Sequence, residues 1–289
     1  MIALCVTLLV VSSTVTLLMR QQRFYRSVGD VLTVRTSMRD GVDILTADLR
    51  TASIQDTVRL AADTAIEFFS TIGASTLCAD PTGDRIIIPA ETLPSGNILT
   101  AWSAMPDSDD FVAVYHDSLA IAPAPGWQRF RITGMSNPPA ATACAPATAI
   151  PSLADLAGGA RAYEITLAPS VIIAARRGAP VRVMRHARYS VYRAGDRKWY
   201  LGYRRCASAG CVPIQPVSGP YDGGDDAPLE LRYYTGAGVR IPTPASSVDV
   251  ARIDIVLRAA SAAEIAIPGL ARAVLRDSLL ATVTPRNGP

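Results

Sequence analysis

The first nineteen residues carry no charge, and apolar side chains occupy most positions from Met1 to Met19. As one α-helix this run would be roughly 28 Å long, which matches the hydrocarbon thickness of a lipid bilayer. We therefore predict that residues 1–19 form the transmembrane half of an N-terminal helix.

The apolar positions that follow recur at steps of three and four, which is the spacing of one helix face. One seven-residue step crosses Arg35, which argues against the alternative of a long coiled coil. We predict that residues 20–52 continue the same helix as an amphipathic half. Gly29 and Gly41 each destabilise this helix by about 1 kcal/mol relative to alanine. Two interpretations are open: the glycines allow close packing against a neighbouring element, or they allow the helix to loosen when its surroundings change. The predicted packing face comprises Phe24, Val28, Val31, Met38, Val42, Leu45 and Leu49.

After Ala52 the pattern changes to short runs that are rich in β-branched and aromatic residues and often alternate apolar with polar positions. Segment 189–205 predicts a hairpin, and segments 229–238 and 248–259 predict another antiparallel pair. We therefore expect residues 53–289 to form one β-rich globular head. The other strand-like runs are 65–73, 84–90, 110–118, 126–134, 161–168 and 180–193.

Of the five cysteines, Cys5 lies in the apolar run. The other four form an even set without metal-ligand spacing, which favours two disulfides in an oxidising compartment, the alternative being buried free thiols. Cys206 and Cys211 enclose four residues, so we expect a local disulfide there rather than a redox-active pair. Cys144 lies in a long Ala- and Pro-rich loop that a bond to Cys78 would pin.

The formal net charge is +3, and nearly all of the basic residues are arginine. This weak excess makes nucleic acid a poor default partner. Arginine and aromatic residues nevertheless interleave between residues 176 and 205, which is the composition of a surface that stacks bases. The candidate nucleic-acid face is Arg182, Arg185 and Arg188, and the alternative is an ordinary arginine-rich outer face of a sheet.

The sequence lacks the motifs of common enzyme classes. His116 and His186 belong to no H-E-x-x-H arrangement, and neither a G-x-S-x-G elbow nor a G-x-x-x-x-G-K-[ST] phosphate loop occurs. The pair His116 and Asp117 fits a strand end better than an acid–base pair. We therefore expect no enzyme activity, no catalytic residues, no cofactor and no small-molecule substrate. A weak calcium candidate, whose spacing is not that of a known calcium loop, consists of Asp222, Asp225 and Asp226.

The charges around the apolar run conflict with the cysteines. Arg20, Arg23 and Arg26 follow the run, so the positive-inside rule taken alone would hold the head in the cytoplasm, where disulfides are rare. A cleaved signal peptide fits poorly, because no basic region precedes the run and no small-residue cleavage site follows it.

Several segments, taken together and in order, carry a resemblance to one protein family. They are MIALCVTLLVVSS, LLMRQQRFYRS, LTADLRTAS (45–53), LRYYTGAG (231–238), VARIDIVLRAA (250–260) and RDSLLATVTPRN (276–287). They look like a PilW-like minor type IV pilin and are similar to the J-type minor pseudopilin of type II secretion, strongly at the two ends and weakly from about residue 80 to 180.

Such proteins normally begin with a basic leader ending in glycine, then a phenylalanine and a glutamate. MIALCV looks like the continuation after that glutamate. We therefore expect Met1 to be an internal methionine of a longer prepilin, whose basic leader would restore the outward orientation.

The resemblance implies an α+β, pilin-like fold in which the long helix packs on an antiparallel β-rich head. It implies a single-pass inner-membrane subunit with a periplasmic head, which primes or caps a type IV pilus-like or type II secretion filament and then enters that filament. Its partners would be other pilins or pseudopilins and the inner-membrane assembly platform, without a cofactor. The alternatives are a DNA- or surface-binding tip adhesin of such a filament and a membrane-anchored envelope protein with no filament role.

Overall fold

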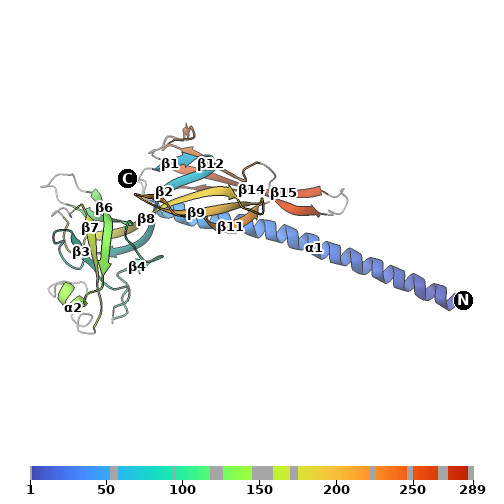
Figure 1. Cartoon of the computed structure of the whole chain (residues 1–289), viewed down its shortest axis with the longest axis horizontal. Helices are drawn as coiled ribbons and strands as arrows, with labels where there is room; N and C mark the ends of the chain where they lie inside the picture. The colour runs from blue at the N-terminus through green and yellow to red at the C-terminus, as the bar shows by residue number, and fades with distance from the viewer. Residues whose placement is uncertain are drawn as a thin grey trace.

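One long helix and two antiparallel sheets make up the protein, and the N-terminal tip of the helix lies far from both sheets (Figure 1). The structure is a computed structural model that describes residues 2–52, 58–93, 95–117, 126–144, 159–169, 175–221, 226–245, 250–265 and 273–285.

The larger sheet is built around β2 (Ala65–Thr76) and β8 (Pro180–Arg193), which pair antiparallel along almost their whole length. On its far side β8 pairs with β5 and with β9 at different heights, and β5 continues the sheet through β6 and β7 to β3. A short helix, α2 (Ala140–Ala143), lies between β6 and β7 in the chain. The remaining strands of this sheet are β1 (Leu60–Ala62), β3 (Arg85–Ile88), β4 (Ala101–Trp102), β5 (Phe111–His116), β6 (Gly126–Ser136), β7 (Tyr163–Ala168), β9 (Trp199–Ala207), β10 (Gly210–Cys211) and β11 (Gln215–Tyr221).

β8 and β9 form the hairpin that the sequence predicts. Val191 lies opposite Leu201, and the turn is closed by the Ala194 N–H, which donates to the Lys198 carbonyl at 2.9 Å. Arg197 adopts a positive φ of 63° in this turn. The turn therefore fixes the register that puts Tyr189 and Leu201 on the buried face of the sheet.

The smaller sheet has the order β13-β12-β14-β15. β12 (Leu229–Tyr234) pairs antiparallel with β14 (Arg252–Ile265), as expected from the alternating pattern of these segments. β14 continues into a long hairpin with β15 (Ala273–Val283), and β13 (Arg240–Ile241) adds two residues to the other edge. This sheet and the larger one face each other around the C-terminal part of the helix (Figure 1).

Helix α1 extends from Ile2 to Thr51, and its 50 residues reach about 75 Å at 1.5 Å per residue. Its C-terminal part contacts β2, β11, β14 and β15, whereas its N-terminal part projects from the head (Figure 1). The apolar face formed by Val34, Met38, Val42 and Leu45 explains this arrangement, because these residues are spaced by three or four and share one side of the helix.

Two large apolar cores lie on the inner face of the larger sheet. The first contains Leu45 and Leu49 of α1, Phe68 of β2 and Leu257 of β14, so it joins the helix to both sheets. The second lies under the β3-β7-β6-β5 part of the sheet and does not include the helix. Only the first core therefore determines where α1 sits.

The prediction of a pilin-like α+β fold is wrong. About 50% of the described residues are strand, every named strand pairing is antiparallel, and one long helix accompanies two sheets. The N-terminal run specifies only the helix. Most of the architecture comes instead from pairings between distant segments, such as β2 with β8, whose partners no local pattern specifies.

The prediction of a transmembrane helix at residues 1–19, and with it a single-pass inner-membrane location, is also wrong. Within the described residues, no helix combines the length and the apolar character that a bilayer crossing requires. The hydroxyl side chains of Ser12, Ser13, Thr14 and Thr16 interrupt the apolar run, and the charge of Arg20 follows directly.

Candidate functional site

The predicted packing face of α1 divides into a buried and an exposed part. Val34 is also buried, and it lies between Val31 and Met38, where the predicted face has a step of seven residues. Arg35 points away from the core. The predicted packing face is therefore buried against the head only from residue 34 onward. Its buried members are Met38, Val42, Leu45 and Leu49, Val31 is half-buried, and Phe24 and Val28 are exposed.

Large exposed apolar side chains point in several directions around the projecting part of α1, and Arg20 and Arg23 lie in the sector between them. Leu17, Leu18 and Met19 are consecutive, so steps of about 100° direct them to three different sides, and they are 58%, 50% and 53% exposed. An apolar surface of this width exceeds the single stripe that a helix normally buries against one partner. The projecting apolar surface comprises Val11, Val15, Leu17, Leu18, Met19, Phe24, Tyr25, Val28 and Leu32.

α1 lies against the head at Gly41 with no room for a side chain. A Cβ at this position would collide with the Tyr221 hydroxyl and would lie 3.2 Å from Leu257 and 3.3 Å from Ser218. Ser218 also donates its hydroxyl to the Ser37 carbonyl at 2.7 Å, one turn earlier in the helix. Gly41 therefore allows β11 to lie directly against the helix backbone.

We expect Gly41→Ala to lower the free energy of unfolding by about 1–3 kcal/mol, because the added methyl group overpacks the contact with Tyr221. Gly29→Ala is the matched control, since a Cβ at Gly29 meets nothing within 4 Å. This control should raise helix stability by up to about 1 kcal/mol. Urea unfolding followed by tryptophan fluorescence measures both variants, and equal effects of the two would show that Gly41 is not a packing position.

A partly buried hydrogen bond also joins α1 to β8. The Tyr189 hydroxyl donates to the Asp48 carboxylate at 2.5 Å. Burial raises the pKa of Asp48 above its ordinary value of 3.8, and the bond from Tyr189 offsets part of that effect. Burial and the neighbouring Asp48 raise the pKa of Tyr189 as well, so its hydroxyl remains a donor.

This pKa shift predicts how Asp48 contributes to stability as the pH changes. Because the folded protein binds a proton at Asp48 more readily than the unfolded chain, ionised Asp48 lowers stability above its folded-state pKa. That loss is recovered as the pH falls from the folded-state pKa to the unfolded value near 3.8. Asp48→Asn should therefore be at least as stable as the wild type at pH 7, and its advantage should shrink at lower pH.

Chemical unfolding of the wild type and Asp48→Asn at several pH values between 4 and 8 measures this difference. Taking the difference between the two proteins removes the titration of the other carboxylates. A difference that does not change with pH would contradict the assignment to Asp48.

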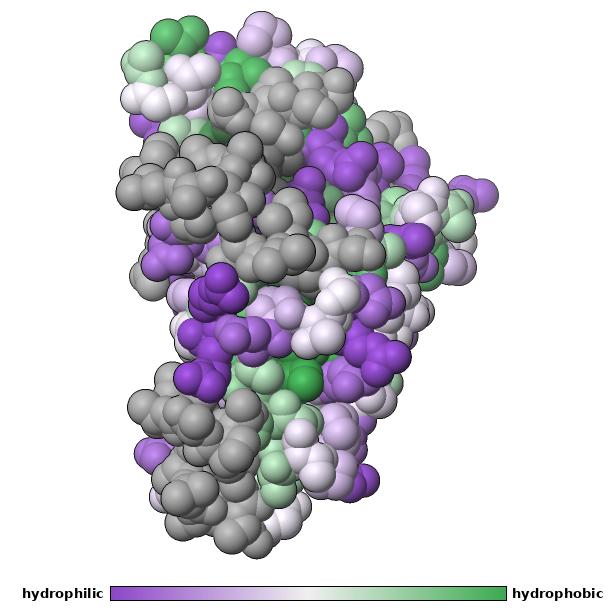
Figure 2. Space-filling model, turned by 90° about the vertical axis from the view of Figure 1, so that its left-hand side faces the viewer, coloured by the Kyte–Doolittle hydropathy of each residue, from purple (hydrophilic) through white to green (hydrophobic). Residues whose placement is uncertain are grey.

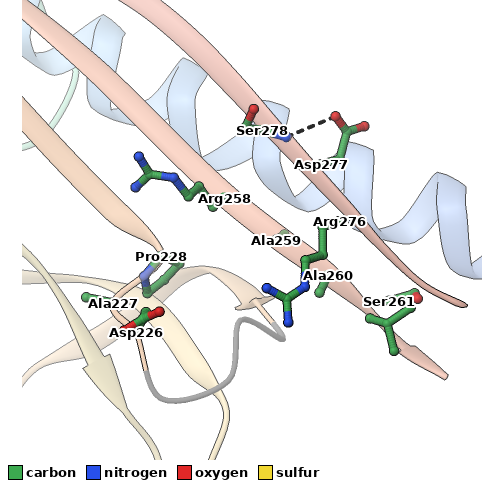
Figure 3. A pocket seen from close by; sticks show the side chains of 11 residues that line it. Asp226, Ala227, Pro228, Arg258, Ala259, Ala260, Ser261, Arg276, Asp277 and Ser278 are labelled. Carbon is green, nitrogen blue, oxygen red and sulfur yellow. Dashed lines mark hydrogen bonds between the residues drawn. The ribbon is translucent and has the colours of Figure 1, made fainter. Parts of the chain in front are cut away.

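An ion pair ties α1 to the β14–β15 hairpin, since Arg35 Nε lies 3.0 Å from the Asp277 carboxylate. Next to this contact is a cleft of about 480 Å³ along the middle of the hairpin, with Arg258 and Arg276 on the two strands and α1 behind them (Figure 3). Arg258 is already paired with Glu230. The cleft is lined by Asp226, Ala227, Pro228, Arg258, Ala259, Ala260, Ser261, Val274, Arg276, Asp277 and Ser278.

Of the three aspartates proposed as calcium ligands, Asp226 lines this cleft. Asp226 is exposed and lies at the rim, where Figure 3 places it across from Arg258 and Arg276. Asp222 and Asp225 lie outside the described residues. The described part of the turn therefore offers a single carboxylate opposite two cations, which does not favour a metal ion.

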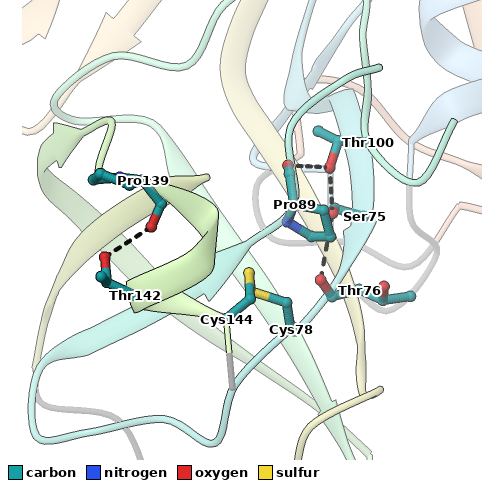
Figure 4. Close-up of a disulfide and its surroundings, with 8 residues drawn as sticks. All are labelled: Ser75, Thr76, Cys78, Pro89, Thr100, Pro139, Thr142 and Cys144. Atoms are coloured by element: carbon teal, nitrogen blue, oxygen red, sulfur yellow. Dashed lines mark hydrogen bonds between the residues drawn. A yellow bond between two sulfur atoms is a disulfide. The ribbon is translucent and has the colours of Figure 1, made fainter. Parts of the chain in front are cut away.

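The four cysteines of the head form two disulfides. Cys78 is bonded to Cys144 in the interior, where the bond attaches the end of α2 to the chain after β2 (Figure 4). Cys206 is bonded to Cys211 across the short β9–β10 turn. One bond thus closes a long stretch of chain and the other a local turn.

The three arginines of the candidate nucleic-acid face do not share a surface. Arg182 and Arg188 lie on one face of β8 and Arg185 on the other, because side chains alternate along a strand. The Arg182 guanidinium lies 4.4 Å from the centre of the Trp127 ring. Arg185 donates from Nε and Nη2 to the buried Asp110 carboxylate at 3.0 and 2.7 Å. Arg185 is therefore a structural residue.

The two histidines are both buried, each with one polar partner. His116 Nε2 lies 3.1 Å from the Gln128 amide, and His186 Nε2 lies 2.7 Å from the Glu67 carboxylate. Asp117 is exposed just after the end of β5, and the partner of His116 Nε2 is Gln128.

Several residues of the helix–head junction escaped the sequence analysis. Val34 breaks the step of seven and could have been found by testing every three- and four-residue spacing. Asp48 and Tyr189 gave no such signal, because a polar residue within an amphipathic helix normally points to solvent. Only the position of β8 beneath the helix makes Asp48 a buried partner.

Comparisons of the chain with known protein families, curated proteins and solved structures found no match. The candidate site is therefore defined by its geometry, which is a helix anchored in the head at one end and carrying exposed apolar side chains on several sides at the other.

Proposed function

We propose that this protein is a structural subunit that assembles with other subunits through its projecting helix, in a filament of the kind formed by minor type IV pilins and pseudopilins. The observation that carries the proposal is the exposed apolar surface between Val11 and Leu32. Exposed apolar patches larger than a few hundred Å² mark interaction sites in most soluble proteins.

The distribution of this surface indicates the number of partners. A single partner helix covers one stripe, as in a two-stranded coiled coil. Leu17, Leu18 and Met19 point to three sides, so covering all of them requires two or more neighbouring helices. A bundle of helices from several subunits, as in a filament core, satisfies this requirement, and it needs no bound cofactor.

The opposite end of the molecule has a different surface. Seen from the side away from the helix tip, the residues shown in colour are mostly hydrophilic or neutral (Figure 2). This contrast supports an arrangement in which the helices are shared between subunits and this end of the head faces water. The resemblance of the segments at both chain ends to minor pilins supports the same class of assembly.

The proposal predicts that a charge on the projecting helix abolishes assembly. The full-length wild type should form species larger than a dimer in sedimentation velocity experiments, increasingly so at higher concentration. Leu18→Lys and Phe24→Lys should be monomeric over the same range, because burying each ammonium group costs several kcal/mol.

Ile98→Lys is the matched control, because Ile98 is 71% exposed on the head. It should assemble like the wild type, and circular dichroism should show equal helix content in all four proteins. A wild type that stays monomeric, or variants of the helix that assemble as well as Ile98→Lys, would refute the proposal.

A further inference from the structure

Three side chains that can bind a metal ion meet on the face of the larger sheet opposite the helix. Glu67 of β2, His186 of β8 and Cys206 of β9 lie on adjacent strands, and their ligand atoms are all within 4.8 Å of one another. His186 and Cys206 are buried, and Glu67 is half-buried. The strand register places them together. Phe69 lies opposite His186, so Glu67, two residues before Phe69, points to the same face of the sheet. Arg205 lies opposite Ala187, so the next residue, Cys206, lies beside His186.

Two existing bonds occupy these groups. His186 Nε2 lies 2.7 Å from Glu67 Oε1, and the sulfur of Cys206 is bonded to that of Cys211. Cys211 is exposed on the two-residue strand β10, so a reductant in solution can reach the disulfide. The three ligand groups are therefore already close together, but the Cys206 sulfur is held in the disulfide and is not a thiolate that can bind a metal ion.

We propose that reduction of the Cys206–Cys211 disulfide opens a zinc site formed by Glu67, His186, Cys206 and Cys211. Two thiolates, one imidazole and one carboxylate are ligands that Zn²⁺ accepts in tetrahedral sites, and four residues between the two cysteines fall within the usual spacing. A borderline-soft ion such as Zn²⁺ is favoured over Ca²⁺ or Mg²⁺, which prefer oxygen ligands alone.

The chemistry requires a dithiol or phosphine reductant. The reductant supplies two electrons that break the S–S bond, and each sulfur takes one proton. The metal ion then replaces these two thiol protons, which are released to solvent. Its bonds to Glu67 Oε1 and His186 Nε2 replace the hydrogen bond between these atoms, and the proton of that bond is exchanged through solvent to Nδ1, which keeps the imidazole neutral.

The charges around the cluster suit the loaded site. Arg188 Nη1 lies 3.8 Å from Glu67 Oε2, and Arg59 and Arg129 lie near His186. Cationic neighbours stabilise thiolates. Two thiolates and one carboxylate carry three negative charges, so the site with Zn²⁺ bound keeps one negative charge beside these arginines.

The geometry requires a small adjustment on metal binding. Tetrahedral bonds of about 2.0–2.3 Å place ligand atoms roughly 3.3–3.8 Å apart. The contact between His186 and Glu67 at 2.7 Å must therefore widen by less than about 1 Å, which a rotation of the Glu67 side chain provides. The ligand atoms, at most 4.8 Å apart, need to close by a similar amount.

Cys211→Ser allows a test without any reductant. This variant frees the Cys206 thiol beside His186 and Glu67 and leaves the Cys78–Cys144 disulfide intact. Titrated with Co²⁺ alone as a spectroscopic probe, full-length Cys211→Ser should bind one ion per chain and show sulfur-to-cobalt charge-transfer absorption. The oxidised wild type should not show this absorption, and the wild type treated with a phosphine reductant should show the band at greater intensity, because it contributes two thiolates.

Variants in the Cys211→Ser background identify the ligands. His186→Gln and Glu67→Gln should each weaken Co²⁺ binding at least tenfold, whereas His116→Gln, which alters the other buried histidine, should leave the affinity unchanged. The double variant Cys206→Ser/Cys211→Ser keeps Cys5 and should lose the absorption band. Circular dichroism establishes that each variant is folded.

The proposal is overturned if folded Cys211→Ser shows no thiolate band, or if the band persists in Cys206→Ser/Cys211→Ser. It is also overturned if the affinity is the same in the Glu67, His186 and His116 variants. These outcomes are separate from the assembly test, which depends on the projecting helix and involves none of these residues.

Discussion

Replacing Asp110 by alanine is expected to lower the free energy of unfolding by about 3–5 kcal/mol, because it leaves a buried cation without its partner. The Asp110 side chain is only 1% exposed. Arg185 donates to it from Nε and Nη2, and Arg205 Nη2 lies 3.5 Å away. Asp110 also accepts the N–H of Asp107 at 2.9 Å. The carboxylate therefore holds two strands and one loop together.

The matched control is Asp107→Asn. Asp107 pairs with Arg205 at 2.8 Å, but its side chain is 62% exposed. Exposed ion pairs contribute between about 0 and 1 kcal/mol, so the effect should be several times smaller. Urea unfolding followed by tryptophan fluorescence gives both values. A loss at Asp110 no larger than that at Asp107 would show that burial does not set the strength of this pair.

Removing the interior disulfide with Cys78→Ala/Cys144→Ala is expected to cost about 4 kcal/mol in the chain-entropy account of cross-links. The bond joins residues 66 positions apart, so it restricts a long segment of the unfolded chain. It also fixes α2 and the neighbouring loop to the end of β2, where both cysteines are fully buried (Figure 4). Loss of this bond should therefore first loosen the small buried cluster that the two cysteines form with Ala140 and Ala162.

The local disulfide provides the comparison. Cys206 and Cys211 are five positions apart, and the same account gives about 2 kcal/mol for Cys206→Ala/Cys211→Ala. Thermal and urea unfolding of the two double variants under non-reducing conditions measures the difference. If the local pair proved as costly to remove as the interior pair, loop entropy would not be the source of the stabilisation.

The sequence predicted local structure well where one face of an element is buried. The hairpin at residues 189–205 and the pairing of β12 with β14 follow from alternating patterns, because a strand buried on one face must alternate. The helix to about residue 52 followed from its three- and four-residue spacing in the same way.

The sequence did not predict what the projecting helix faces. An uncharged N-terminal run and a resemblance at the chain ends led to a membrane anchor and a pilin-like fold, and the structure supports neither. Apolar composition predicts that a surface is buried away from water, but it does not predict whether lipid, another helix or the head of the same chain covers that surface. Phe24 and Met38 belong to one sequence pattern, yet only Met38 enters the core.

The sequence by itself determined the long helix, the strand periodicity and the set of cysteines available for disulfides. Only the tertiary structure decided which residues meet, as in the bonds of Asp48 with Tyr189 and of Arg185 with Asp110, and in the cluster of Glu67, His186 and Cys206. The physical reason is the difference in sequence separation between the two kinds of contact. Periodicity reflects the nearest neighbours along the chain, whereas these contacts depend on strand order and register, which arise from the packing of the whole chain.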